Sequence, residues 1–145
     1  MAKIAEIAAD IFAEPTDRFY VHCISGDYAL QSEMAQKFDE RFSLGFVLNN
    51  TFPTEKDYQK YLGRALQTGQ VYNLVVKDRS KGRADYRSIR MALMDLRNQC
   101  YLWNRKKLAF SKPSFVADGL NWNSLLVVIE DVFLYKDVDI LIYEQ

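Results

Sequence analysis

The sequence is poor in residues that bind transition metals. It contains one histidine and two cysteines, Cys23 and Cys100, and it has no CxxC motif. These residues cannot supply the four ligands of a tetrahedral zinc site, so we expect no metal and no cofactor. Because both cysteines lie among apolar residues, we expect reduced and buried thiols, as in a cytoplasmic protein.

Long apolar runs and an excess of one charge are missing as well. No stretch approaches the roughly 20 apolar residues of a membrane span. The opening MAKIAEIAAD carries acidic residues and is unlike a signal peptide, so we expect no membrane partner. The 19 basic residues balance 19 acidic ones. The bulk charge therefore does not indicate direct nucleic-acid binding, and only a local basic patch stays open.

The chain does have a regular alternation of apolar patterns within 145 residues, the size of one domain. Short runs rich in aromatic and β-branched residues predict buried strands at 18–24, 71–77, 107–111 and 138–143. Residues 3–10, KIAEIAAD, fit a strand or a helix equally well.

Three helices are predicted between these strands. They begin after Ser32, after Asp85, and after either Asn121 or Asp118, which are all good helix N-caps. The alternation predicts an α/β fold, a three-layer α/β/α sandwich with a mixed, largely parallel sheet. We expect a single domain over 1–145.

One segment, 43–70, does not follow the alternation. We interpret it as an excursion from the sheet core. Within it, TEKDYQKYLGRAL at 54–66 has helical spacing and predicts a short helix capped by Thr54.

Polar residues follow the predicted strands. Asp10 follows the first strand, Ser25 and Lys77 follow the next two, and 112–119 follows the fourth. Ligands of open α/β sheets bind beyond the carboxyl ends of the strands. We therefore expect these residues to surround one cleft.

The order of these segments resembles that of a macrodomain. The segments are VHCISGDYALQSEMAQKF, YNLVVKDR, DYRSIRMAL, DGLNW and VFLYKDVDILIY. Within that family the chain is similar to the terminal ADP-ribose protein glycohydrolases and to antitoxins that remove ADP-ribose from DNA. The resemblance covers nearly the whole chain apart from 43–70. It implies ADP-ribose, or an ADP-ribosylated protein or nucleic acid, as the partner.

The resemblance also implies roles for individual residues. Asp10 would contact the adenine amino group and Ser25 the distal ribose, while Lys77 and Asp118 would act on the anomeric carbon. The remaining residues of the implied ligand site are Ile11, Ser32, Phe115 and Gly119. Phe115 could stack on a ribose or base, or it could plug the cleft.

The chain departs from the family in its phosphate loops. The family's Met-Gly-Ala-Gly-Ile-Ala is LQSEMA at 30–35, its Gly-x-Gly is SFV at 114–116, and Ala9 replaces a glycine. Glycine lets backbone N–H groups approach phosphate oxygens closely. Glu33 adds a charge of the wrong sign. We therefore expect weaker diphosphate binding unless a basic residue compensates, the candidates being Arg79, Lys81, Arg83 and Lys112.

Ordinary structural roles compete with each of these assignments. Lys77 could be a solvated surface charge, Asp118 a helix cap, and Asp10 a turn residue. His22 fits a hydrogen-bonded core histidine, and Cys23 points to the opposite face of its strand, so a His-Cys dyad is disfavoured.

Two functions of different classes follow. Lys77 and Asp118 favour a hydrolase that cleaves an ADP-ribosyl linkage, with Asp118 stabilising positive charge or activating water and Lys77 acting as nucleophile or proton donor. Gln31, Glu33 and Phe115 favour a non-catalytic module that binds ADP-ribose or another nucleotide-like ligand. Of the two functions, the sequence favours the hydrolase.

Overall fold

The structure, a computed structural model, describes residues 2–13, 15–114 and 118–144. In these ranges a six-stranded sheet has the order β1-β6-β5-β2-β4-β3. All neighbouring strands are parallel except β3, which pairs antiparallel with β4. The strands are β1 Lys3–Ala8, β2 Phe19–Ser25, β3 Ala65–Thr68, β4 Val71–Lys77, β5 Lys107–Ser111 and β6 Asp139–Glu144.

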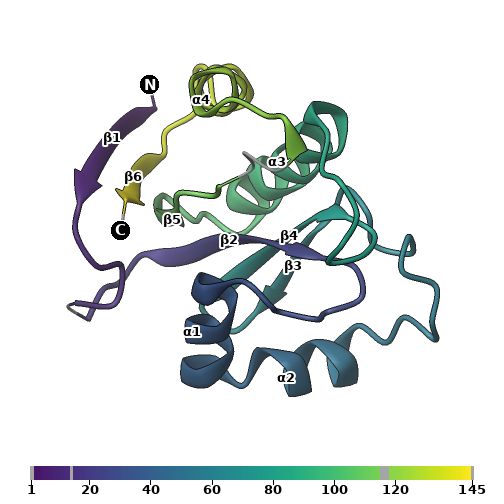
Figure 1. Ribbon diagram of the computed structural model, residues 1–145. Helices are drawn as coiled ribbons and strands as arrows, with labels where there is room; N and C mark the ends of the chain where they lie inside the picture. Colours follow the sequence, from purple (N-terminus) through teal and green to yellow (C-terminus); the bar gives the residue numbers. More distant parts are fainter. Residues whose placement is uncertain (1, 14, 115–117, 145) are drawn as a thin grey trace.

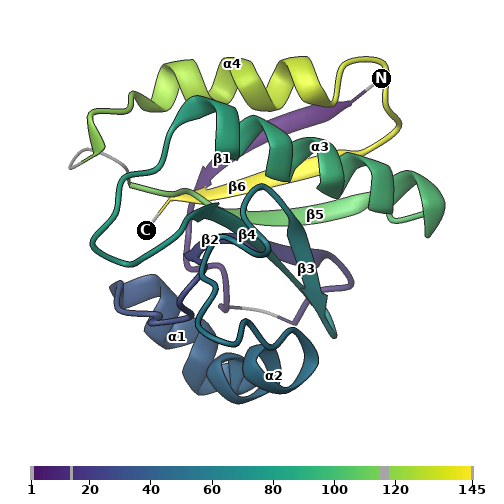
Figure 2. The same cartoon turned by 90° about the vertical axis from the view of Figure 1, so that its right-hand side faces the viewer.

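Helices cover both faces of the sheet (Figures 1 and 2). On one face lie α3, Tyr86–Leu102, and α4, Trp122–Val132; on the other lie α1, Glu33–Phe42, and α2, Leu44–Thr51. Each face has its own cluster of buried apolar side chains, because sheet and helices bury their apolar sides against each other. The predicted three-layer α/β/α sandwich with a mixed, largely parallel sheet is confirmed.

Local signals set the starts of three helices. The side chains of Ser32, Asp85 and Asn121 each accept a hydrogen bond from the backbone N–H three residues later. These bonds satisfy donors that have no partner within the helix. The cap of α4 is therefore Asn121, and Asp118 lies outside this role.

The expected helix at 54–66 is wrong. Residues 55–56 and 58–63 form turns, and Glu55 and Lys56 have left-handed backbone, with φ of 55° and 69°. A right-handed helix cannot continue through such residues. The chain then enters β3, which no strand pattern had indicated, because its partner β4 supplies the hydrogen bonds. A helix occurs earlier instead, α2, which buries Leu44 and Leu48.

The ambiguous segment 3–10 is a strand. β1 pairs parallel with β6 at the edge of the sheet, and this tertiary pairing outweighs the helical propensity of its alanines. Cys23 and Cys100 are both free thiols. Cys100 is buried as expected, but Cys23 is only partly buried. None of the helices in the described ranges is long and apolar enough to cross a bilayer.

Candidate functional site

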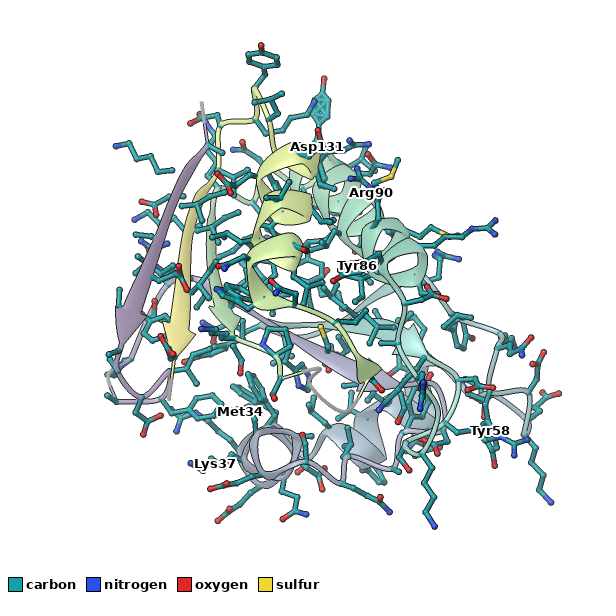
Figure 3. The ribbon with its side chains drawn as sticks, turned by 45° about the horizontal axis from the view of Figure 1, so that its top comes forward. Met34, Lys37, Tyr58, Tyr86, Arg90 and Asp131 are labelled. Carbon is teal, nitrogen blue, oxygen red and sulfur yellow. The ribbon has the colours of Figure 1, made fainter. Side chains whose placement is uncertain are left out.

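A cleft of roughly 720 Å³ opens at the carboxyl ends of the central strands. Ser25 of β2, Lys77 of β4, Ser111 of β5 and Tyr143 of β6 line it. The start of α1 and the residues around Asp118 complete the wall. Figure 3 shows Met34 and Lys37, two further lining residues, on α1. Cavities of this volume hold small organic ligands.

Lys77 and Asp118 both line this cleft. Lys77 is the last residue of β4, and Asp118 lies in the connection between β5 and α4. Both side chains are partly buried. Within the described ranges, no salt bridge engages either residue. An ammonium and a carboxylate are thus presented to the same space.

Ser25 is oriented by a neighbouring carboxylate. Its Oγ donates to Asp27 Oδ1 at 2.6 Å, so towards a ligand this hydroxyl presents an acceptor. The register between β2 and β4 shifts just before Ser25. Gly26 N–H then donates to the Lys77 carbonyl at 2.8 Å. A Cβ on Gly26 would collide with the carbonyl oxygen of Tyr58, so this position needs glycine.

Asp27 joins the ends of β2 and β4. It accepts from the backbone N–H groups of Ala29 at 3.1 Å and Ser80 at 3.0 Å. Burial alone would raise the pKa of the Asp27 carboxyl, but the hydrogen bonds from Ser25, Ser80 and Ala29 outweigh burial and lower this pKa. The ionised carboxylate therefore holds both strand ends in place around the cleft.

His22 and Cys23 line the cleft, but neither side chain is charged near neutral pH. His22 is 3% exposed, and burial lowers its pKa to about 4. Burial raises the pKa of the Cys23 thiol to about 12, so no thiolate forms near neutral pH. His22 is the core histidine that the sequence suggested. Among the described residues, no group of three His, Cys, Asp or Glu side chains could hold a metal ion.

Known proteins match this chain over nearly its full length, although no family model matches. The ADP-ribose glycohydrolases OARD1 of Bos taurus and Homo sapiens are 24% and 23% identical over 152 aligned residues, which cover 98% of this chain and 91% of each relative. The macrodomain of Mycobacterium tuberculosis DarG superimposes with a TM-score of 0.80, at 18% identity, over 100% of this chain and 99% of that one. The chain has the macrodomain fold.

Other solved macrodomains agree. That of Thermus aquaticus DarG has a TM-score of 0.78 at 14% identity, with both chains covered completely. Thermosipho africanus DarTG in complex with ADP-ribose has a TM-score of 0.75 at 12% identity, covering 97% of this chain and 41% of that one. At such identities the solved structures establish the fold, and the sequence resemblance is to the glycohydrolases.

The loop before α1 has left-handed backbone at two positions that are not glycine. Tyr28 and Leu30 have left-handed backbone, with φ of 56° and 48°. Such conformations are costly for residues with a Cβ and persist only where the surroundings hold them. Both side chains are buried, and the Tyr28 hydroxyl donates to the Phe52 carbonyl at 2.8 Å. Packing against the segment after α2 therefore holds the path.

The wall beside this loop carries charges of both signs. Glu33 lies in the first turn of α1, 90% exposed, and its carboxylate is 4.0 Å from the ammonium of Lys37. Of the four compensating cations suggested by the sequence, Lys112 is the one that the described cleft lining contains. Lys37 was missed, although its place four residues after Glu33 puts the two on one helix face. Tyr143 was also missed, because strand alternation alone does not show which face meets a ligand.

Some predicted site residues lie apart from the cleft lining. Asp10 is exposed in a turn after β1, where its Oδ1 accepts from Phe12 N–H at 2.9 Å. Ile11 is buried in the core at 3% exposure, and Gly119 is exposed with φ of 75°. Ser32 does line the cleft, although its hydroxyl also caps α1. Phe115 lies outside the described residues.

Proposed function

We propose that this protein binds ADP-ribose and hydrolyses an ADP-ribosyl linkage on a protein or a nucleic acid. The observation that carries the proposal is the placement of Lys77 and Asp118 in one cleft at the carboxyl ends of β2, β4, β5 and β6. The resemblance to ADP-ribose glycohydrolases over 98% of the chain supports it. A cytoplasmic location stays a prediction.

The reaction breaks the bond between the ribose anomeric carbon and the acceptor. Positive charge grows on that carbon in the transition state, and the Asp118 carboxylate stabilises this charge or takes a proton from the attacking water. Lys77 Nζ either donates a proton to the leaving acceptor or, as the free amine, attacks the anomeric carbon and displaces the acceptor. In the second route the resulting glycosylamine opens to an imine, which water hydrolyses to free the lysine. In both routes water supplies the new hydroxyl group on the ribose. Trapping with borohydride separates them, because only the second route leaves a reducible adduct on the protein.

The remaining polar groups of the cleft bind and orient the ligand. Ser25 Oγ donates to Asp27, so it offers an acceptor to a ribose hydroxyl. Lys37 and Lys112 provide positive charge where the family uses glycine loops to hold a diphosphate. Each lost backbone hydrogen bond to a charged oxygen costs roughly 1.5–3 kcal/mol. We therefore expect ADP-ribose to bind more weakly than to a macrodomain with glycine loops.

A binding module without turnover is the second candidate. The observation that favours it is the loop before α1, where Tyr28 and Leu30 take left-handed backbone without glycine. This rebuilt loop could serve a nucleotide-like ligand other than ADP-ribose.

The test combines calorimetry with a turnover assay. ADP-ribose is titrated into the wild type, Lys77→Ala and Asp10→Ala, and release of ADP-ribose is followed from an ADP-ribosylated acidic peptide and from an ADP-ribosylated oligonucleotide. We expect Lys77→Ala to abolish release while affinity stays within a few fold. Asp10→Ala, at a position outside the described cleft lining, tests the adenine contact that the resemblance implies: a loss of affinity with release retained would support that contact.

The matched control is Lys81→Ala, which removes an exposed lysine that does not line the described cleft. It should behave as the wild type. Release at the same slow rate by the wild type and Lys77→Ala would show that Lys77 is a surface lysine and would overturn the proposed hydrolase activity. No binding at millimolar ADP-ribose would favour the module with another ligand.

A further inference from the structure

The segment that carries Asp118 joins the sheet to the last helix. β5 ends at Ser111 and α4 begins at Trp122, so residues 112–121 form the connection (Figure 2). Lys112 is the first residue of this connection, and Trp122 is the residue that follows it. The position of Asp118 in the cleft depends on how these two ends are held.

Both ends meet at one carboxylate of the edge strand. Glu6 of β1 accepts a hydrogen bond from Trp122 Nε1 at 2.9 Å, through Oε1. The same oxygen lies 3.9 Å from Lys112 Nζ. Lys112 Nζ also lies 5.0 Å from the centre of the Trp122 ring. Glu6, Lys112 and Trp122 therefore form a closed triangle of a carboxylate, an ammonium and an indole.

The triangle is built into the fold at its corners. Lys112 is only 22% exposed, and Glu144 of β6 accepts from it at 3.2 Å. The backbone N–H of Lys112 donates to the Tyr143 carbonyl at 3.0 Å. At the other end, Asn121 N–H donates to the Tyr86 hydroxyl of α3 at 3.0 Å. One strand, β6, and one helix, α3, therefore support the two residues that Glu6 contacts.

We infer that Glu6 is a positioning residue that holds Lys112 and Trp122, which flank Asp118 in the chain, and through them keeps Asp118 in place. The inference rests on the proposed function for its effect on turnover. The chemical reason is that the Trp122 indole N–H donates to the Glu6 carboxylate at the surface, and the same carboxylate faces the largely buried ammonium of Lys112. Glu6 contacts both residues from a third element, so its loss removes one contact from each end of the segment at once.

The expected effect falls on the chemical step rather than on binding. A catalytic group displaced by about 1 Å loses rate on the order of 100-fold. Glu6→Ala should therefore lower kcat by roughly 10- to 100-fold. Affinity for ADP-ribose should change less than kcat, because Glu6 lies outside the cleft lining that the described residues form and reaches a ligand only through Lys112.

The experiment compares three variants of the full chain by steady-state kinetics, ADP-ribose calorimetry and hydrogen exchange. Glu6→Ala removes both contacts, while Glu6→Gln keeps an acceptor for Trp122 and loses the charge that faces Lys112. Glu144→Gln is the matched control, because it removes the other anion beside Lys112 and leaves Trp122 untouched. We expect exchange to rise around Lys112 and around Asp118 to Trp122, most in Glu6→Ala and less in Glu6→Gln and Glu144→Gln, each of which removes a single contact, with kcat falling most in Glu6→Ala.

Two outcomes would overturn the inference. One is unchanged exchange in 112–121 of Glu6→Ala, or a rise spread evenly over the chain. The other is faster exchange there with wild-type kcat. A wild type without turnover would defeat the proposed function instead, and the exchange measurement would still decide whether Glu6 holds the segment.

Discussion

The single histidine of the chain gives a sharp prediction about acid stability. His22 Nε2 lies 2.6 Å from Asn73 Oδ1, and its ring stacks on Phe38 with centroids 4.1 Å apart. The amide nitrogen of Asn73 already donates to the Leu66 carbonyl and the Thr68 hydroxyl. This network leaves Asn73 Oδ1 as an acceptor, so it assigns the proton of a neutral ring to Nε2.

The magnitude follows from the pKa of His22. Burial lowers this pKa from 6.5 to about 4 in the folded protein, although the bond to Asn73 opposes the shift. Between pH 6.5 and pH 4, His22 binds a proton in the unfolded chain but stays neutral in the folded chain. The stability that the protein gains from keeping His22 neutral is therefore complete above pH 6.5, and it is lost as the pH falls towards 4. At about 1.4 kcal/mol per pKa unit, the loss is about 3 kcal/mol.

The assay is urea unfolding between pH 7 and pH 4 for the wild type and His22→Gln. Glutamine does not titrate, and its amide can still donate to Asn73. The variant starts less stable, because it loses the stacked ring, but its free energy of unfolding should fall by about 3 kcal/mol less over this range. Parallel curves would refute the reasoning. So would a midpoint near 6.5 in an NMR titration of the His22 ring in the folded protein.

Two further predictions concern backbone roles in the site. Asn121→Ala should lower the free energy of unfolding in urea by about 1 kcal/mol, because Asn121 caps α4. Asp118→Ala should stay within about 0.5 kcal/mol of the wild type. Equal losses for the two variants would contradict the assignment of the cap to Asn121. Gly26→Ala should lower the melting temperature strongly, because its Cβ would meet the Tyr58 carbonyl, and Gly45→Ala inside α2 should not. Similar melting temperatures for these two variants would show that the chain beside Gly26 yields easily.

Local patterns predicted much of the fold. The strands at β2, β4, β5 and β6 follow apolar runs, and α1 and α3 begin after the expected caps Ser32 and Asp85. The local pattern at 54–66 predicted a helix, but this segment forms turns and then the strand β3, which pairs with β4. A strand at the sheet edge depends on its partner more than on its own residues.

The strand-end rule brought Ser25, Lys77 and Asp118 to one cleft, because the carboxyl ends of parallel strands share one edge of the sheet. The same rule did not bring Asp10 into the cleft lining. The order of the strands places β1 at the sheet edge, with β6 between it and β5.

By itself, the sequence determined the α/β alternation and the starts of α1 and α3, since these depend on neighbours a few residues away. Only the tertiary structure decided which distant groups meet. It set the burial that keeps His22 neutral, and it brought Lys112 and Trp122 to Glu6. Burial and charge pairing are properties of segments far apart in the chain, so they exist only once the layers have packed.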